Sequence, residues 1–186
     1  MKRFILIISL CLMAISINAQ TEHVKFMGIP LNGTITQFQQ KLQAKGIEHD
    51  QEGSRELGPG SRLFKGTFAG EKAEIYINYD ANTKIVYRGK AVVRCLSLSI
   101  ANQLYENLRI NLENKYDRFE PIKRTSSDGY SIMNLGIPGS NGDLIGEVDI
   151  WVSKNEYSYS FPYTVYIDYW DFYNNEKHES SINDDL

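Results

Sequence analysis

A strict alternation of apolar and polar residues restricts the fold of this chain more than any other feature. The clearest case covers residues 73–80, where two opposite sets alternate: Ala73, Ile75, Ile77 and Tyr79 against Glu74, Tyr76, Asn78 and Asp80. Side chains that follow one another along a strand point to opposite faces of its sheet. One face is then covered by a core and the other meets solvent, as in an antiparallel sheet.

The same pattern predicts six strands in two groups of three, bounded by turn residues. The first group covers residues 62–69, 73–79 and 84–93, and the second covers 130–137, 144–152 and 156–170. We therefore expect an α+β fold built around antiparallel strands.

A helix is predicted before each group of strands. For residues 35–45, Thr34 and Gln37 have the spacing of a capping box, and Gly46 suits the left-handed position after the last turn. The second helix is expected from the cap Ser99 to about Tyr116. The helical stripes are Ile35, Phe38 and Leu42 in the first, and Ile100, Ala101, Leu104, Tyr105, Leu108 and Leu112 in the second.

Helix, polar loop and three strands thus occur twice, which favours an internal duplication over two unrelated α+β units. Segment 41–45 corresponds to 111–115, and segment 74–78 to 149–153. The predicted units cover residues 20–94 and 95–173, and their strands are expected to form one continuous sheet or two abutting sheets with both helices on one face. The acidic, apolar-poor tail, residues 174–186, is expected to be frayed.

Residues 1–19 have the pattern of a secretory signal peptide, with Lys2 and Arg3 before an apolar run and Ala19 before the expected cut. The apolar run is too short for a transmembrane span. A lipoprotein acylated on Cys11 is the disfavoured alternative, because Leu10 stands where a small residue is expected. We expect a periplasmic or secreted protein.

Behind the leader, this tandem helix-plus-sheet unit resembles the beta-lactamase-inhibitor-protein-like fold. The start Phe26-Met27-Gly28-Ile29-Pro30, followed by a capped helix, is similar to small exported proteins of unknown function from gut Bacteroidetes. The resemblance implies binding through the open face of the sheet. It is architectural and assigns no role to any individual residue.

Composition and motifs exclude several classes of function. Loss of Lys2 and Arg3 with the leader changes the net charge from −3 to −5, which argues against a nucleic-acid partner. No metal or cofactor site is predicted, since His23, His49, His178 and Cys95 have no ligand spacing. Cys95 is expected to be a small buried apolar residue. The glycine-rich segment 136–142 is interpreted as a hairpin turn rather than a phosphate loop.

One pair of carboxylates leaves an enzymatic alternative open. Alternation places Glu147 and Asp149 on the open face beside Trp151, and paired carboxylates are what a glycosidase uses as acid and base. No feature of the sequence indicates a raised pKa for either group, so solvated charges are the preferred interpretation. The alternative function is a small hydrolase of glycan or peptide; an envelope-assembly factor is a further one.

The preferred hypothesis is a non-enzymatic exported binding module for a protein, peptide or glycan. In both halves the open face would carry an acid, an aromatic and a small polar residue in alternate positions. Exposed aromatic side chains are enriched in binding hot spots. The predicted contact residues are Tyr76, Trp151, Tyr166 and Trp170, with Glu74 and Asp149 setting the charge preference. The competing interpretation is that a loop or the other unit covers these aromatics.

Overall fold

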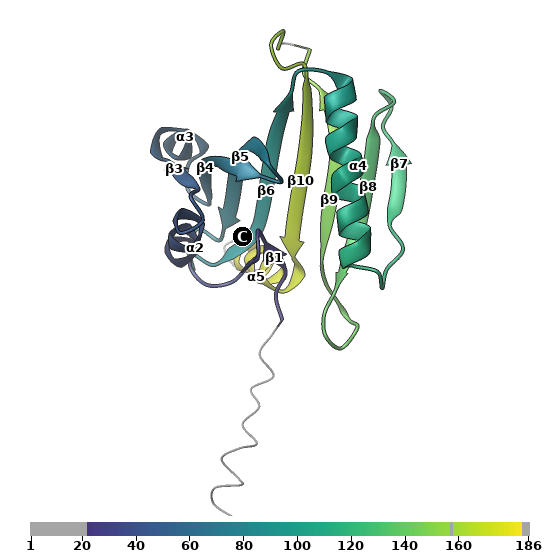
Figure 1. Ribbon diagram of the computed structural model, residues 1–186. Coiled ribbons are helices and arrows are strands. Elements are labelled where there is room, and N and C mark those ends of the chain that lie inside the picture. Colours follow the sequence, from purple (N-terminus) through teal and green to yellow (C-terminus); the bar gives the residue numbers. More distant parts are fainter. Residues whose placement is uncertain (1–21, 157, 184–186) are drawn as a thin grey trace, which may run out of the picture.

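A computed structural model describes residues 22–156 and 158–183 of the 186-residue chain (Figure 1). The predicted leader, residues 1–19, lies outside the described residues, and export therefore stays a prediction. In the described part the fold is α+β, with an eight-stranded antiparallel sheet, a two-stranded sheet and four helices. No described helix combines the length and apolar character that crossing a membrane requires.

The elements of the described part run in the following order. They are β1 (Lys25–Phe26), β2 (Ile29–Pro30), α2 (Ile35–Gln43), β3 (Glu48–Asp50), α3 (Gln51–Leu57), β4 (Ser61–Phe68), β5 (Glu71–Tyr79), β6 (Val86–Cys95), α4 (Leu98–Lys115), β7 (Ile122–Thr125), β8 (Ser131–Pro138), β9 (Leu144–Lys154), β10 (Tyr163–Asp171) and α5 (Phe172–Asn183).

The large sheet has the order β3-β4-β5-β6-β10-β9-β8-β7, and every neighbouring pair is antiparallel. Each half of the chain forms a meander that runs inward from an edge. The last strands of the two meanders, β6 and β10, pair at the centre of the sheet. Strands from both halves therefore form one continuous sheet.

The predicted strands are found, with two corrections to the loops. Both predicted polar loops contain a short edge strand, β3 and β7, and the first also contains α3. Their pairing partners supply the backbone hydrogen bonds, so these polar segments need no alternating pattern of their own. The last strand begins at Tyr163, not at residue 156. Tyr159 and Phe161 fall within the predicted strand but precede β10 and are exposed, because the chain forms a loop before Pro162.

Alternation correctly predicts which face of the sheet is covered. Every second residue of β5 is buried, and one continuous core lies between the sheet and the apolar stripes of α2 and α4. The capping box of Thr34 and Gln37 is present, and Gly46 has a φ of 78°. The second helix begins two residues earlier than predicted, with Ser97 as its cap, and Ile100 lies outside its buried stripe.

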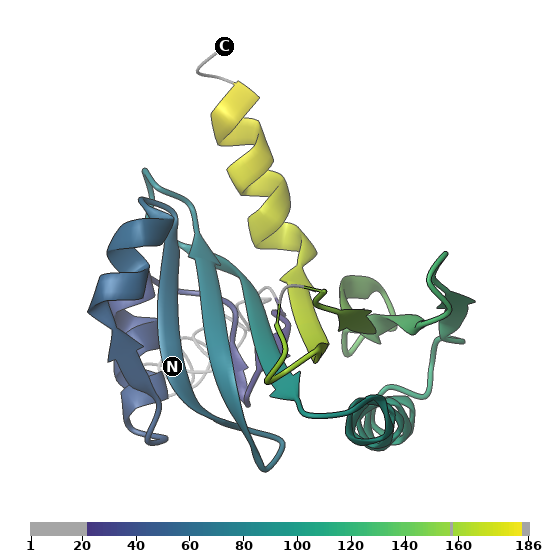
Figure 2. The same cartoon turned by 90° about the horizontal axis from the view of Figure 1, so that it is seen from above.

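Helices lie on both sides of the sheet. Figure 1 shows α4 in front of β9, with α2 and α3 beside the opposite edge near β3 and β4. Figure 2 shows α5 extending from the sheet on the side away from α4, which is seen end-on.

The predicted frayed tail is wrong for residues 174–183, which belong to α5. Asp171 accepts a hydrogen bond from the backbone N–H of Asn174 at 3.0 Å. The buried Asn174 amide donates to the carbonyl oxygens of Leu31 and Val86, at 2.7 and 3.1 Å. Polar bonds to distant segments thus hold the start of α5, and a search for apolar periodicity does not detect them. Residues 184–186 lie outside the described part.

Candidate functional site

The six predicted site residues, four contact aromatics and two acids, belong to β5, β9 and β10 and lie on one face of the sheet. Residues directly opposite in an antiparallel pair share a face, and the register links Glu74, Val92, Tyr166 and Trp151 in one row across β5, β6, β10 and β9. A second row links Tyr76, Lys90, Asp168 and Asp149. The structure therefore brings all the predicted residues together, with Trp170 in the next row opposite Arg88.

We call this surface the open face, defined by the residues of these rows: Glu74, Tyr76, Arg88, Lys90, Val92, Glu147, Asp149, Trp151, Tyr166, Asp168 and Trp170. The six predicted contact residues are all partly exposed, so neither a loop nor the other half of the chain buries them completely. The face opposite carries the core.

Trp151 and Tyr166 stack against each other across β9 and β10. Their ring centroids are 4.8 Å apart and the ring planes differ by 8°. This distance matches the spacing of adjacent strands, about 4.8 Å. The two rings therefore project from the sheet with their faces parallel and in contact, and they do not lie flat on the sheet. The pair forms an upright aromatic ridge.

Arg88 and Asp168 hold Trp170. The guanidinium carbon of Arg88 lies 3.9 Å from the centroid of the Trp170 ring system. The Arg88 Nε donates to Asp168 Oδ1 at 2.8 Å, and a second Arg88 nitrogen donates to Oδ2. Asp168 is buried. This bidentate pair fixes the guanidinium in place, and the guanidinium covers one side of the tryptophan.

A third group surrounds Tyr76. Its hydroxyl donates to Glu74 at 3.1 Å, and Arg94 donates to both oxygens of the Glu74 carboxylate, at 3.1 and 3.0 Å. The ammonium of Lys90 lies 5.2 Å from the Tyr76 ring centroid. Burial, with the charge and hydrogen bonding of Glu74, raises the pKa of Tyr76 to about 12. Burial and the neighbouring Arg88 lower the pKa of Lys90.

The carboxylate pair is tied to a single amide. Asn134 Nδ2 donates to Glu147 Oε2 at 2.9 Å and to Asp149 Oδ1 at 2.8 Å. Burial, together with the charges of Glu147 and Asp168, raises the pKa of Asp149 although Asn134 opposes the shift. The expectation that nothing raises a pKa here is therefore wrong, because burial cannot be read from a strand pattern. The bridging Asn134 amide nevertheless engages one oxygen of each carboxylate.

Two cavities lie near the turn between β4 and β5, and the first of them is lined in part by the open-face residues Glu74 and Val92. The first has a volume of about 540 Å³, and its lining includes Lys65, Lys72, Glu74, Val92, Arg94 and Phe161. The second, of about 920 Å³, lies between this turn and α4. Lys72, Arg94 and Phe161 line both cavities. Neither cavity includes Glu147 or Asp149.

Sequence reasoning missed the basic residues that hold the aromatics. Alternation along β6 puts Arg88, Lys90 and Arg94 on the same side of the strand, with Arg94 just beyond the rows that define the open face. Their partners depend on the register between β6, β5 and β10, which the sequence does not show. Within residues 22–156 and 158–183, no group of three His, Cys, Asp or Glu side chains is arranged to hold a metal ion.

Comparisons with protein-family models, with curated proteins and with solved structures give no match to this chain.

Proposed function

We propose that this protein is an exported, non-enzymatic binding module that engages a protein or peptide through the open face. One observation carries the proposal: a cross-strand neighbour holds each predicted contact aromatic. Tyr166 stacks on Trp151, Arg88 covers Trp170, and Lys90 lies over Tyr76.

Aromatic side chains fixed before binding lose little conformational entropy when a partner arrives. Binding energy is usually concentrated in a few such residues, with tryptophan, tyrosine and arginine over-represented. The open face combines all three types with paired charges. This composition supports recognition of a partner rather than catalysis.

The orientation of the rings favours a polypeptide over a glycan. Sugars gain most from stacking on a broad, accessible ring face, but Trp151 and Tyr166 turn one face toward each other. The upright ridge instead suits insertion between side chains of a partner. A flat sugar-binding platform would need these two rings to lie down on the sheet.

Export and duplication belong to the same proposal. The charged start, apolar run and Ala19 of the leader support export. Each half of the chain supplies a helix and then an inward meander, with α2 and α4 leading the two halves, and this order supports a tandem repeat of the beta-lactamase-inhibitor-protein-like kind. Mass spectrometry of the exported chain tests the leader, since cleavage leaves Gln20 as the first residue.

The test of binding uses the purified chain from residue 20 onward. Immobilised protein is screened against a phage-displayed random peptide library and a glycan array, and ligands that bind are titrated. Tyr76→Ala combined with Trp151→Ala is expected to weaken binding at least about tenfold, which corresponds to about 1.4 kcal/mol. Circular dichroism shows whether the variant is folded.

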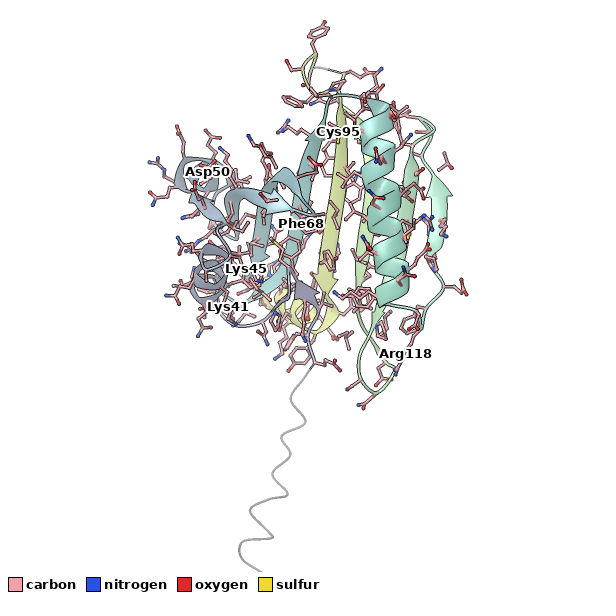
Figure 3. The ribbon with its side chains drawn as sticks, viewed as in Figure 1. Lys41, Lys45, Asp50, Phe68, Cys95 and Arg118 are labelled. Atoms are coloured by element: carbon pink, nitrogen blue, oxygen red, sulfur yellow. The ribbon has the colours of Figure 1, made fainter. Side chains whose placement is uncertain are left out.

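Lys45→Ala is the matched surface control. Lys45 is exposed just after α2 (Figure 3), and its substitution is expected to leave binding unchanged. Equal affinity of the double variant and the wild type for every recovered ligand would refute the role of the open face. Ligands found only among glycans would contradict the preference for polypeptide.

The raised pKa of Asp149 favours one second candidate, a hydrolase that uses Asp149 as an acid and Glu147 as its partner. Turnover of a chromogenic glycoside or peptide that Asp149→Asn abolishes would support it. Because Asn134 already binds both carboxylates, we expect no turnover by the wild type or by the Asp149→Asn variant.

A further inference from the structure

The larger cavity is a cleft between α4 and the turn that joins β4 to β5. Its lining comes from the turn, from the end of β6 and the connection to α4, from one side of α4, and from Phe161. Cys95, the last residue of β6, lies at this end of the sheet near the start of α4 (Figure 3). The cleft has a volume of about 920 Å³.

Apolar side chains gather around this cleft. Leu96, Ile100, Ile110 and Phe161 line it and are between 41% and 63% exposed. Scattered apolar residues are normal on a protein surface, but several around one hollow are typical of a binding site. Leu104 and Leu108 continue the apolar lining toward the core.

A row of amides runs along the same wall of α4. Gln103, Asn107 and Asn111 line the cleft at intervals of four residues and are exposed. In the part of the chain that the structure describes, no hydrogen bond engages these side-chain amides. Their spacing corresponds to about 6 Å along the helix axis. Alternate residues of an extended chain are about 6.6–6.8 Å apart. The two spacings are similar enough for the flexible amide side chains to reach alternate residues of an extended peptide.

We propose that this cleft binds an extended segment of a partner polypeptide. The amides would donate to and accept from its backbone at alternate residues, and its intervening side chains would enter the apolar part of the cleft. From Ile100 to Asn111 the helix rises by about 16 Å, which accommodates about five extended residues. A helical segment fits less well, because its backbone groups are already paired.

Charge and continuity point to the same occupant. The α4 wall contributes no charged residue to the cleft, since Glu106, Arg109 and Glu113 pair with one another on that helix without lining it. A neutral wall complements a neutral, apolar segment. At the far end, Lys72, Arg94 and Phe161 also line the cavity beside the open face. The inference thus rests on the proposed function and extends that surface around the end of the sheet.

The test pans a phage library of random seven-residue peptides against the chain from residue 20 onward. Enriched sequences are synthesised with a fluorophore and titrated by fluorescence anisotropy. They are expected to be uncharged and to alternate apolar and polar residues. Asn107→Leu combined with Asn111→Leu is expected to weaken binding at least tenfold, since leucine keeps the bulk and removes the amide. N-methylation of alternate peptide nitrogens is expected to weaken binding similarly.

Asn102→Leu is the matched control. Asn102 is exposed on the same helix and does not line the cleft, so this variant is expected to bind as the wild type does. Size-exclusion chromatography with light scattering records the oligomeric state of each variant. The folded state is verified by circular dichroism.

Two results would overturn the inference. One is that no peptide is enriched, or that enriched peptides bind the Asn107→Leu, Asn111→Leu variant as tightly as the wild type. The other is that the protein is a dimer which this variant dissociates, so that a second copy fills the cleft. If Tyr76→Ala with Trp151→Ala abolishes binding but Asn107→Leu with Asn111→Leu does not, the proposed role of the open face is supported and that of the cleft is refuted. If only the Asn107→Leu, Asn111→Leu variant loses binding, the proposed role of the open face is refuted.

Discussion

Replacement of Asp80 by asparagine is expected to loosen α5 and destabilise the protein. Asp80 lies at the end of β5 and is only 5% exposed. Its Oδ1 accepts from the backbone N–H groups of Asn82 and Thr83 and from the Thr83 hydroxyl, at 3.0, 2.6 and 2.9 Å. Its Oδ2 accepts from His178 at 2.8 Å and from Ser181 at 2.9 Å. One carboxylate therefore fixes a turn and the middle of α5.

The size of the effect follows from which of these bonds the amide can keep. An asparagine at position 80 preserves the oxygen that holds the turn, but its NH₂ group cannot accept from His178. Ser181 already donates to the His178 carbonyl oxygen at 2.8 Å, so the loss falls mainly on the histidine. A hydrogen bond to a charged group contributes about 1.5–3 kcal/mol. We expect Asp80→Asn to lower the free energy of unfolding by about 2 kcal/mol.

The effect is also expected to depend on pH. Burial alone would raise the pKa of Asp80, but hydrogen bonds from His178, Thr83 and Ser181 outweigh it and hold the pKa well below its ordinary value of 3.8. The folded state then binds the proton more weakly than the unfolded chain. The carboxylate contributes its full stability above the ordinary pKa and loses it as the pH falls toward the folded-state pKa.

Urea unfolding monitored by circular dichroism at several pH values measures both effects. The difference between wild type and Asp80→Asn is expected to be largest near neutral pH and to shrink below about pH 4. Asp128→Asn, in an exposed turn, is the control and is expected to change stability by less than about 0.5 kcal/mol. A loss for Asp80→Asn as small as that of the control, or a difference that stays constant down to pH 3, would refute the reasoning.

Three further experiments test the packing: a single substitution, a double-mutant cycle and a labelling reaction. A Cβ on Gly146 would lie 2.1 Å from the Trp170 carbonyl oxygen, so Gly146→Ala is expected to cost at least about 1–3 kcal/mol in thermal or urea unfolding; an unchanged midpoint would contradict this register. A double-mutant cycle of Trp151→Ala and Tyr166→Ala is expected to give a coupling energy of about 0.5–1.5 kcal/mol, and additive effects would show that the rings do not stack. Burial, with the charge of Glu71, raises the pKa of the Cys95 thiol; iodoacetamide is therefore expected to label Cys95 rapidly only after unfolding, and fast labelling of the native chain would contradict its burial.

The open face and the cleft suggest one surface with two kinds of contact. The open face offers fixed aromatic and charged groups, whereas the cleft offers apolar surface and unengaged amides. Lys72, Arg94 and Phe161 lie where the two meet. The affinity of a variant that combines Trp151→Ala with Asn107→Leu would show whether one partner spans the open face and the cleft. If one ligand contacts both surfaces, each substitution weakens the binding of that same ligand.

Local patterns in the sequence determined the elements and their covered faces. Alternation along β5 identified both its buried and its open side, and the capping box at Thr34 marked the start of α2. These features need only neighbouring residues, so a single sequence contains them. The same alternation predicted that Glu74, Tyr76, Asp149, Trp151, Tyr166 and Trp170 point away from the core, and the strand register places them on one face.

Only the tertiary structure decided which residues meet across the chain. The register of β6 and β10 places Arg88 on Trp170, and that pairing joins residues 82 positions apart. Short polar strands such as β3 exist because a neighbour supplies their hydrogen bonds, and α5 is ordered by Asp80 and Asn174 rather than by an apolar stripe. Such contacts depend on distance in space, which periodicity along the chain does not encode.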